Sequence, residues 1–286
     1  MPGHPDEHII EAIGRCRITI RDGKVVSVGD PLIHECPLAR RFAVPVHEIS
    51  AEGVAENILH RIQSFGMCRP DRQVLTSGEF VGFGASELIS FGLAMGLFDA
   101  AVIACDGAGT VIATIPDLVQ GIGGRMSGLV KTSPHPSVIA AIEESGGIVP
   151  FPETADIDQV RGVAAARAAG FSRIAVTIAD PRDSRAIREA YPGAFIIAVH
   201  TTGLTSDQAA ILADTSDVVT ACASRAVRDV AGSRALLQAG SSIPVFAMTQ
   251  PAKDLILEKV RTGAGQFLVT GVRLPFAGDS GPEPLV

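Results

Sequence analysis

The fold of this chain is decided by one stretch, AAVIACDGAGTVIATIPDLVQGIGGRMSGLVK, which runs from Ala100 to Lys131. An apolar run ends in Cys105 and Asp106, a glycine turn and a second apolar run follow, and a glycine-rich basic segment closes the stretch. Because the first apolar run is typical of a buried strand, we expect Cys105 and Asp106 at its carboxyl end, where parallel sheets bind their ligands. The stretch therefore predicts a sheet and a site at its edge.

From residue 134 onward, apolar runs alternate with amphipathic segments at steps of roughly 22 to 25 residues. We expect helices over 134–145, 157–169, 182–190, 206–213 and 224–238, and one more before the last strand. We expect strands over 148–150, 173–179, 195–199, 217–220, 243–248 and 267–270. Such an alternation forms a mostly parallel sheet with helices on both faces. The predicted fold class is α/β, with an open doubly wound sheet favoured over a barrel.

The start of the chain has a different pattern. Two short alternating runs are joined by Asp22-Gly23, which is typical of a β-hairpin turn. Ser50 and Gly66 bound a segment with apolar residues at helical spacing. We therefore expect an N-terminal β-hairpin element and loop over 1–50 and an α/β domain over 51–272. A flexible tail is expected over 273–286, because it is rich in proline, glycine and acid.

The composition restricts the class of protein. With 286 residues, of which 47% are hydrophobic, the chain can bury a core. Its net charge of −7, with both signs interspersed, argues against a nucleic-acid partner and a polybasic membrane patch. No apolar run reaches the roughly 18 residues of a membrane span, and the N-terminus lacks a signal-peptide pattern. We expect a soluble, cytoplasmic protein with a small anionic substrate, and a homodimer is compatible with the sequence.

Two thiols and an imidazole follow apolar runs. Cys105, His200 and Cys222 each stand at or just after the end of an expected strand. Since the carboxyl ends of parallel strands meet at one edge of a sheet, these side chains are expected at the same edge. Thiols are not typical turn residues, so the pattern indicates a function for Cys105 and Cys222.

Glycine-rich segments and strand ends supply candidate substrate-binding residues, because their backbone N–H groups can bind anions. These candidates are Gly84, Ser86, Gly107, Gly109, Gly123, Gly124, Arg125, Ser127, Lys131, Thr201 and Thr202. The lysine spacing does not match a phosphate-binding loop, so a nucleotide site is not predicted. A tight turn before a helix at 84–86, and a flexible lid or subunit contact at 123–131, explain the same glycines equally well.

Several motifs together resemble the methanogenesis marker protein 8 family. They are CPL at 36–38, FGMC at 65–68, FVGFGASE at 80–87, ACDGAGTVI at 104–112, LVQGIGGRMSGLVKTSP at 118–134, VHTTGL at 199–204 and TACAS at 220–224. The resemblance covers nearly the whole chain after residue 8. It implies a link to methane metabolism, or another use of the same scaffold, but no particular reaction.

Four of the five cysteines predict an iron–sulfur site. Cys36, Cys68, Cys105 and Cys222 could hold a cluster, with 4Fe–4S as the expected type, and three thiolate ligands would leave one iron open to substrate. The chain has no CxxC pair, so the fold would have to bring the thiols together, and a structural zinc ribbon is not expected. With Asp106, His200 and Cys222 as catalytic residues, we expect an iron–sulfur-dependent lyase or desulfidase acting on a small carboxylate-bearing compound.

Two other functions are compatible with these residues. A metal-free enzyme would use Cys105 or Cys222 as nucleophile, His200 as base and the turn 107–109 as oxyanion donors. A non-catalytic carrier or maturation factor would hold a cofactor or cluster for delivery to a partner. The histidines at 4, 8, 47, 60 and 135 are expected on the surface or on helix faces, and His34 near Cys36 is a weaker ligand candidate.

Overall fold

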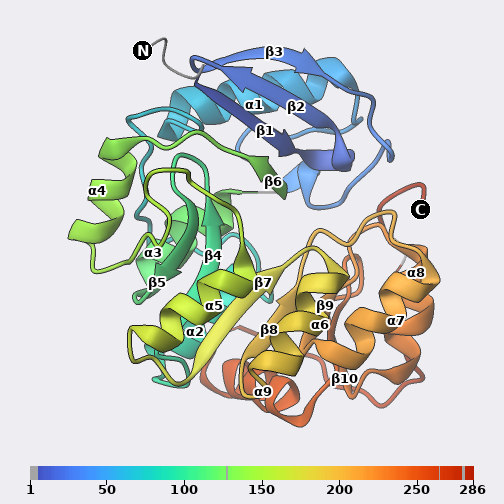
Figure 1. The fold of residues 1–286 in the computed structure, drawn as a ribbon. Coiled ribbons are helices and arrows are strands. Elements are labelled where there is room, and N and C mark those ends of the chain that lie inside the picture. The colour runs from blue at the N-terminus through green and yellow to red at the C-terminus, as the bar shows by residue number, and fades with distance from the viewer. Residues whose placement is uncertain (1–5, 127, 264, 279–280) are drawn as a thin grey trace.

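The structure is a computed structural model that describes residues 6–126, 128–263, 265–278 and 281–286. A small sheet in the order β3-β2-β1-β6 lies above a larger sheet in the order β10-β11-β9-β8-β7-β4-β5 (Figure 1). The strands are β1 Glu7–Glu11, β2 Arg17–Arg21, β3 Lys24–Val28, β4 Ala100–Cys105, β5 Gly109–Ala113, β6 Gly128–Lys131, β7 Ile174–Ile178, β8 Phe195–Ala198, β9 Val218–Thr220, β10 Leu237–Ala239 and β11 Val245–Ala247. The α-helices are α1 Ala51–Phe65, α2 Ala85–Ala94, α3 Pro116–Ile122, α4 Pro136–Glu144, α5 Gln159–Ala168, α6 Pro181–Ala190, α7 Ser206–Thr215, α8 Arg225–Val230 and α9 Gln250–Thr262.

The small sheet combines the start of the chain with one strand from its middle. The hairpin predicted at Asp22-Gly23 is present as β2 and β3, and all strand pairs of this sheet are antiparallel. The pairing of β1 with β6 brings the end of the stretch 100–131 to the N-terminal strands. Helix α1, which the sequence analysis places in the domain 51–272, instead shares the apolar core of this sheet. Its two ends are the predicted ones, with the Ser50 hydroxyl as N-cap and a left-handed Gly66 as C-cap.

The larger sheet is mixed, so the expectation of a mostly parallel sheet is wrong in this respect. Strands β4, β7, β8 and β9 are parallel, whereas β5 pairs antiparallel with β4, and β11 and β10 extend the opposite edge antiparallel. The link from β4 to β5 is the short turn 106–108, which is too short for the crossover that a parallel pair needs. The described strands leave both edges open, as the doubly wound alternative predicts.

The strand expected over 148–150 is reduced to a single bridge between Ile148 and Ile112. Further differences from the sequence-based expectations lie near the C-terminus. The helix expected over 224–238 ends at Val230, and β10 takes its last part. The strand expected over 267–270 is not formed, and Leu268 is 91% exposed there, so its apolar run is not part of the core. Within the tail, Val286 accepts a backbone hydrogen bond from Arg225 and donates one to Ala223, and Glu283 bridges to Glu35. These residues are therefore packed against the rest of the protein.

Helices cover both faces of the larger sheet. Helices α2, α3, α4 and α9 contribute to the apolar core on one face, and α5, α6, α7 and α8 to the core on the other. Alternate residues of β4 serve the two cores, with Ile103 in the first and Val102 in the second. Among the described residues, no helix has the length and apolar character that crossing a membrane requires.

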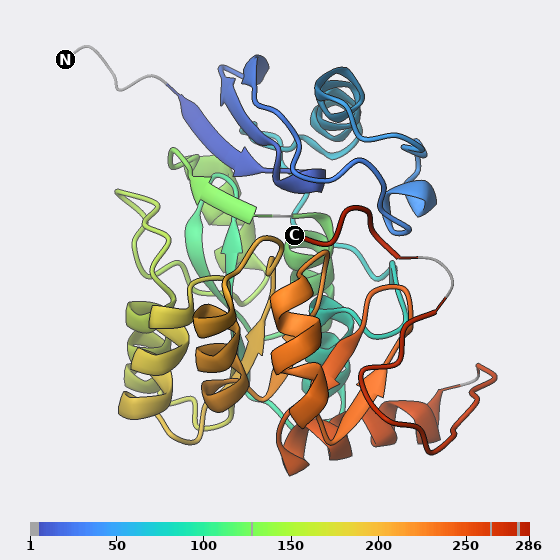
Figure 2. The ribbon, with the colours of Figure 1, turned by 90° about the vertical axis from the view of Figure 1, so that its right-hand side faces the viewer.

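The arrangement of the two sheets places the functional region. Figure 2 shows the small sheet and α1 over one end of the larger sheet, with the C-terminal segment ending close to both. The carboxyl ends of the parallel strands point toward the small sheet, so residues that follow these strands face residues from β1, α1 and the loop before β6.

Candidate functional site

A cleft of about 1720 Å³ lies between the two sheets. It is lined by residues at or just after the ends of β4, β7, β8 and β9, by α1, by the start of α2 and by the loop before β6. The predicted site residues that line it are Cys36, Gly84, Ser86, Gly123, Gly124, Arg125, His200, Thr202 and Cys222. Five of the motifs quoted above contain these residues, and the fold brings them to one place.

Cys36 and Cys222 are the thiols of the predicted set that face the cleft, and both are partly buried. Cys36 comes from the loop before α1, and Cys222 follows β9. Burial raises the pKa of the Cys36 thiol, and the charge of a Cys222 thiolate adds to this effect. The two cysteines line the same cleft, although they are far apart in sequence.

Three predicted site residues have left-handed backbone conformations, which are uncommon for residues with a β-carbon. The φ angles are +57° at Cys68, +57° at His200 and +38° at Cys222. Such conformations cost roughly 1–3 kcal/mol each and concentrate at functional sites. The last two stand directly at the cleft, at the ends of neighbouring parallel strands.

Arg61 and Arg125 form an arginine pair at the cleft. Each guanidinium lies over an aromatic ring, with Arg61 4.9 Å from the centroid of Phe42 and Arg125 4.9 Å from that of Phe65. Arg61 Nη1 donates to the Arg125 carbonyl oxygen at 3.2 Å, whereas Arg125 Nη1 is buried without a hydrogen-bond partner. Burial and the nearby charge of Arg72 lower the pKa of Arg125, and the same causes lower that of Arg61 to about 10.

The arginine pair has no carboxylate counterpart. In the part of the chain that the structure describes, neither Arg61 nor Arg125 has a carboxylate within ion-pair distance. Both arginines are partly exposed at the cleft, and a buried guanidinium nitrogen without a partner favours an anion there. Sequence reasoning identified Arg125 but missed Arg61, whose signal is a charged residue between Ile58, Ile62 and Phe65 on the apolar face of α1.

His200 is engaged with the small sheet. Its Nε2 atom lies 2.6 Å from Glu11 Oε2, and Arg15 Nε donates to the same oxygen at 3.0 Å. Arg15 Nη1 also donates to the Thr202 carbonyl oxygen at 2.6 Å. The hydrogen bond from His200, with the contribution of Arg15, lowers the pKa of Glu11 to about 2. In this geometry His200 holds β1 against the end of β8, and its Nε2 atom is not directed as a free base at a thiol.

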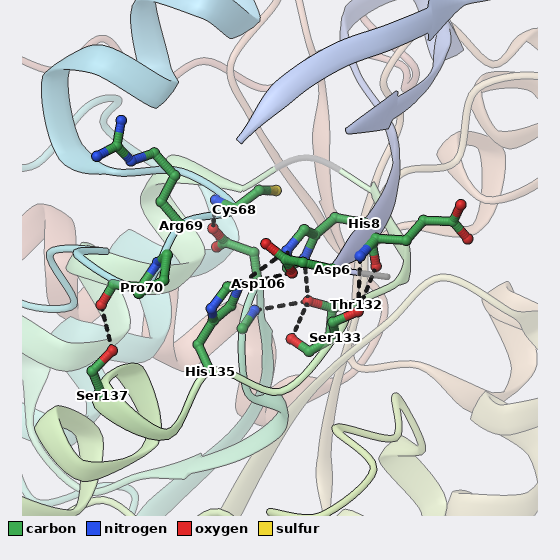
Figure 3. Close-up of polar contacts among 12 residues, drawn as sticks. Asp6, His8, Cys68, Arg69, Pro70, Asp106, Thr132, Ser133, His135 and Ser137 are labelled. Carbon is green, nitrogen blue, oxygen red and sulfur yellow. Dashed lines mark hydrogen bonds and ion pairs between the residues drawn. The ribbon is translucent and has the colours of Figure 1, made fainter. Parts of the chain in front are cut away.

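The other predicted cysteines and Asp106 do not line the cleft. Cys68 and Cys105 are wholly buried, and burial followed by the charge of Asp106 raises the pKa of both thiols. The Asp106 carboxylate accepts a hydrogen bond from the Cys68 N–H at 2.6 Å (Figure 3) and pairs with Arg72 at 3.0 Å. The catalytic role predicted for Asp106 therefore finds no support in its position, because both oxygens are used inside the protein.

The remaining predicted substrate residues have structural partners outside the cleft. Gly107 N–H donates to Thr132 Oγ1 at 2.7 Å, and a β-carbon at Gly109 would stand 2.2 Å from the Ala155 carbonyl oxygen. Lys131 pairs with Glu7 at 2.9 Å, and Thr201 Oγ1 donates to the Thr220 carbonyl oxygen at 2.6 Å. Ser127 lies outside the described residues.

A carboxylate of the protein itself, that of Glu87, lies at the start of α2. Glu87 is 1% exposed and accepts hydrogen bonds from the N–H groups of Phe80 and Val81 at 3.0 and 3.2 Å. A β-carbon at Gly84 would meet its Oε2 atom at 2.2 Å. Gly84 and Ser86 thus line the cleft beside a carboxylate of the chain itself, which favours the tight-turn interpretation of this segment.

The sequence predicts surface or helix-face positions for His8 and His135, and the structure buries both. His8 is 0% exposed and His135 is 6% exposed, and they lie beside Asp6 (Figure 3), outside the lining of the cleft. The sequence carries little signal for this contact, since His8 stands at the start of a short strand and His135 between two prolines.

Comparison with known proteins gives a family and one close relative. A family model described as "Uncharacterized protein conserved in archaea (DUF2099)" matches residues 8–261. The chain is 37% identical over 284 residues to a protein of Methanocaldococcus jannaschii named "Uncharacterized protein MJ0054", with 98% of this chain and 100% of that protein covered. No solved structure matches this chain.

Proposed function

The chain belongs to this archaeal DUF2099 family, and we propose that it is an enzyme that binds a small anionic substrate in the cleft and acts on it with a cysteine thiol. The observation that carries the proposal is the buried, unpartnered Nη1 atom of Arg125 beside Arg61. The finer resemblance to the methanogenesis marker protein 8 family is part of the proposal, and the origin of the relative in Methanocaldococcus supports it.

The arginine pair supports the choice of an anionic substrate. A carboxylate or phosphate oxygen at Arg125 Nη1 would supply the partner that this buried nitrogen lacks. A planar guanidinium held against the Phe65 ring presents its donors in a fixed direction, which suits such an oxygen. A hydrogen bond between charged groups contributes about 1.5–3 kcal/mol, so this contact can control affinity.

The thiols support the choice of chemistry. Cys222 has a strained backbone, lines the cleft and follows a parallel strand, which is where α/β enzymes carry reacting groups. We assign it the role of reacting thiol, with Cys36 as the second thiol of the same cleft. Cys105, the alternative nucleophile, is wholly buried and its thiol pKa is raised, so it is the weaker candidate.

The iron–sulfur lyase or desulfidase is the second candidate. It is favoured by the position of Cys36 and Cys222 in the lining of one cleft, because both could ligate one cluster. Cys68 and Cys105 lie outside the cleft lining, so a 4Fe–4S cluster at this place would need other ligands or a rearrangement. Anaerobic purification followed by an absorption spectrum and iron and sulfide analysis separates the two candidates, since iron lost on Cys36→Ser or Cys222→Ser would favour the cluster.

The anion site is tested by thermal unfolding with inorganic phosphate, sulfate, and simple mono- and dicarboxylates as probes. We expect at least one of them to raise the unfolding temperature of the wild type. In Arg125→Met, the same rise in unfolding temperature should require an anion concentration about tenfold higher or more, because a charge-assisted hydrogen bond is lost. Without anion, Arg125→Met should be as stable as the wild type or more stable, because a buried unpartnered group has been removed.

Arg261→Met is the matched control. Arg261 is a 70% exposed arginine on α9 that pairs with Glu258, away from the cleft lining. It should keep the full response to anions. Equal responses in Arg125→Met, Arg61→Met and wild type would contradict the anion site, and tight binding of an anion or cofactor without any turnover would favour the carrier function.

A further inference from the structure

Three side chains from distant parts of the chain converge beside β1. Asp6 directly precedes β1, His8 lies on it, and His135 is the N-cap residue of α4 (Figure 3). His8 Nε2 is 2.9 Å from Asp6 Oδ1 and 3.1 Å from His135 Nε2, and His135 Nε2 is 3.2 Å from the same Asp6 oxygen. The three atoms thus form a nearly equilateral triangle.

We propose that Asp6, His8 and His135 bind one divalent transition-metal ion. With metal–ligand bonds of about 2.0–2.1 Å, ligand atoms are separated by roughly 2.9 Å on an octahedral face and 3.3 Å in a tetrahedron, and the observed triangle lies between these values. Two imidazoles and one carboxylate suit zinc, iron(II) and similar first-row ions. Magnesium and calcium fit less well, because they prefer oxygen ligands.

The surroundings of His8 orient it for this role. Its Nδ1 atom lies 2.6 Å from Thr132 Oγ1, and the same hydroxyl oxygen accepts the Gly107 N–H at 2.7 Å. With Nδ1–H donated to Thr132, the Nε2 lone pair of His8 faces His135 and Asp6. A hydrogen bond of this kind to the second ring nitrogen is typical of metal-binding histidines.

The burial of the two rings also favours a ligand role. The two imidazole planes are nearly parallel, with an interplanar angle of 7° and centroids 5.1 Å apart, and the two Nε2 atoms face each other at 3.1 Å. The Asp6 side chain is 27% exposed, which leaves an approach for the ion and for further ligands such as water.

The ion would connect the two parts of the fold. His8 and His135 are separated by 127 positions, and the site joins β1 of the small sheet to the start of α4, which packs on the larger sheet. None of the three residues lines the cleft. The metal site is therefore independent of the proposed thiol chemistry, and its assignment stands or fails separately.

Cobalt(II) is the probe for this site. The full-length protein is freed of metal with a chelator and titrated with cobalt chloride, with visible absorption and calorimetry as readouts. We expect one ion per chain and no thiolate-to-cobalt absorption in the near ultraviolet. Loss of a ligand in His135→Gln or Asp6→Asn should weaken binding by at least roughly 100-fold. Thr132→Val should weaken it by about tenfold or more, since loss of the hydrogen bond that orients a ligating histidine typically costs about 10–100-fold.

Three controls make the result decisive. His47→Gln changes an exposed histidine and should bind cobalt like the wild type. The double variant Cys36→Ser with Cys222→Ser should also retain binding, whereas a thiolate band that disappears in this variant would place the metal in the cleft and overturn the proposal. Circular dichroism checks folding, and the partly exposed Asp6 provides a test if His135→Gln does not fold. Unchanged affinity in the triad variants, or no binding by the wild type at millimolar cobalt, would overturn it too.

Discussion

Arg72 and Asp106 form an ion pair in which neither side chain is exposed to solvent, with Arg72 Nε 3.0 Å from Asp106 Oδ1. Arg72 also donates to the Gly121 carbonyl oxygen at 3.0 Å, and the Cys68 N–H donates to Asp106 Oδ2. The pair therefore joins the segment after α1, the end of β4 and α3. It explains why Asp106, although it follows a parallel strand, has a structural position.

Substitution of Asp106 by asparagine should be strongly destabilising. The change leaves the Arg72 guanidinium buried without its counter-charge, and breaking a buried pair typically costs about 3–5 kcal/mol of unfolding free energy. Urea unfolding measures the effect. The matched control is Asp71→Asn, which removes the exposed pair of Asp71 with Arg69 and should cost less than about 1 kcal/mol. Similar losses of unfolding free energy in the two variants would show that the buried ion pair stabilises the fold no more than the exposed pair does.

The five cysteines should differ in reactivity toward iodoacetamide in the native protein. Cys36 and Cys222 are partly exposed at the cleft, whereas Cys16, Cys68 and Cys105 are buried. Burial raises the pKa of the Cys68 and Cys105 thiols, which keeps them in the unreactive protonated form. Mass spectrometry after brief labelling should find the label on Cys36 and Cys222. The buried cysteines should be labelled only after unfolding, and early modification of Cys105 would contradict the assignment of the cleft thiols.

The contact between Glu11 and His200 predicts a pH-dependent contribution to stability. The pKa of Glu11 is lowered from 4.5 to about 2 in the folded protein. The contribution is therefore fully present above the unfolded pKa, near pH 4.5, and is lost as the pH falls toward 2. Urea unfolding should show Glu11→Gln less stable than the wild type at pH 6, and the difference should shrink between pH 4.5 and pH 3. Glu56→Gln, at an exposed position of α1, should show no such difference, and a constant gap for Glu11→Gln would argue against the ionic contribution.

Gly109 should be needed for folding rather than for substrate binding. Its φ angle is +70°, and an added β-carbon would stand 2.2 Å from the Ala155 carbonyl oxygen. Left-handed strain and overpacking each cost roughly 1–3 kcal/mol, so Gly109→Ala should lose about 2 kcal/mol or more in thermal or urea unfolding. Gly193→Ala is the control, since a β-carbon there would meet no atom within 4 Å. A neutral Gly109→Ala would reopen the substrate-binding interpretation.

Local sequence signals predicted the elements well where a few neighbouring residues determine them. The Asp22-Gly23 turn, the caps of α1 at Ser50 and Gly66, and the alternation of helices and strands from 157 to 220 all depend on such short-range patterns. The same rules placed His200 and Cys222 at strand ends. They did not predict the directions of the strands at the sheet edges. Strands β5 and β10 run antiparallel to their neighbours, and an apolar run looks the same in a parallel and an antiparallel strand.

The sequence by itself therefore determined the α/β class, the N-terminal hairpin and a group of polar residues at the carboxyl ends of strands. Only the tertiary structure decided that Cys36 and Cys222 face the cleft while Cys68 and Cys105 are buried. The tertiary structure also places His8 Nε2 3.1 Å from His135 Nε2, although the two residues are 127 positions apart in the sequence. The physical reason is that backbone propensities act over a few residues, whereas the pairing of β1 with β6 and the packing of the small sheet on the larger one result from burying apolar faces that lie far apart in the chain.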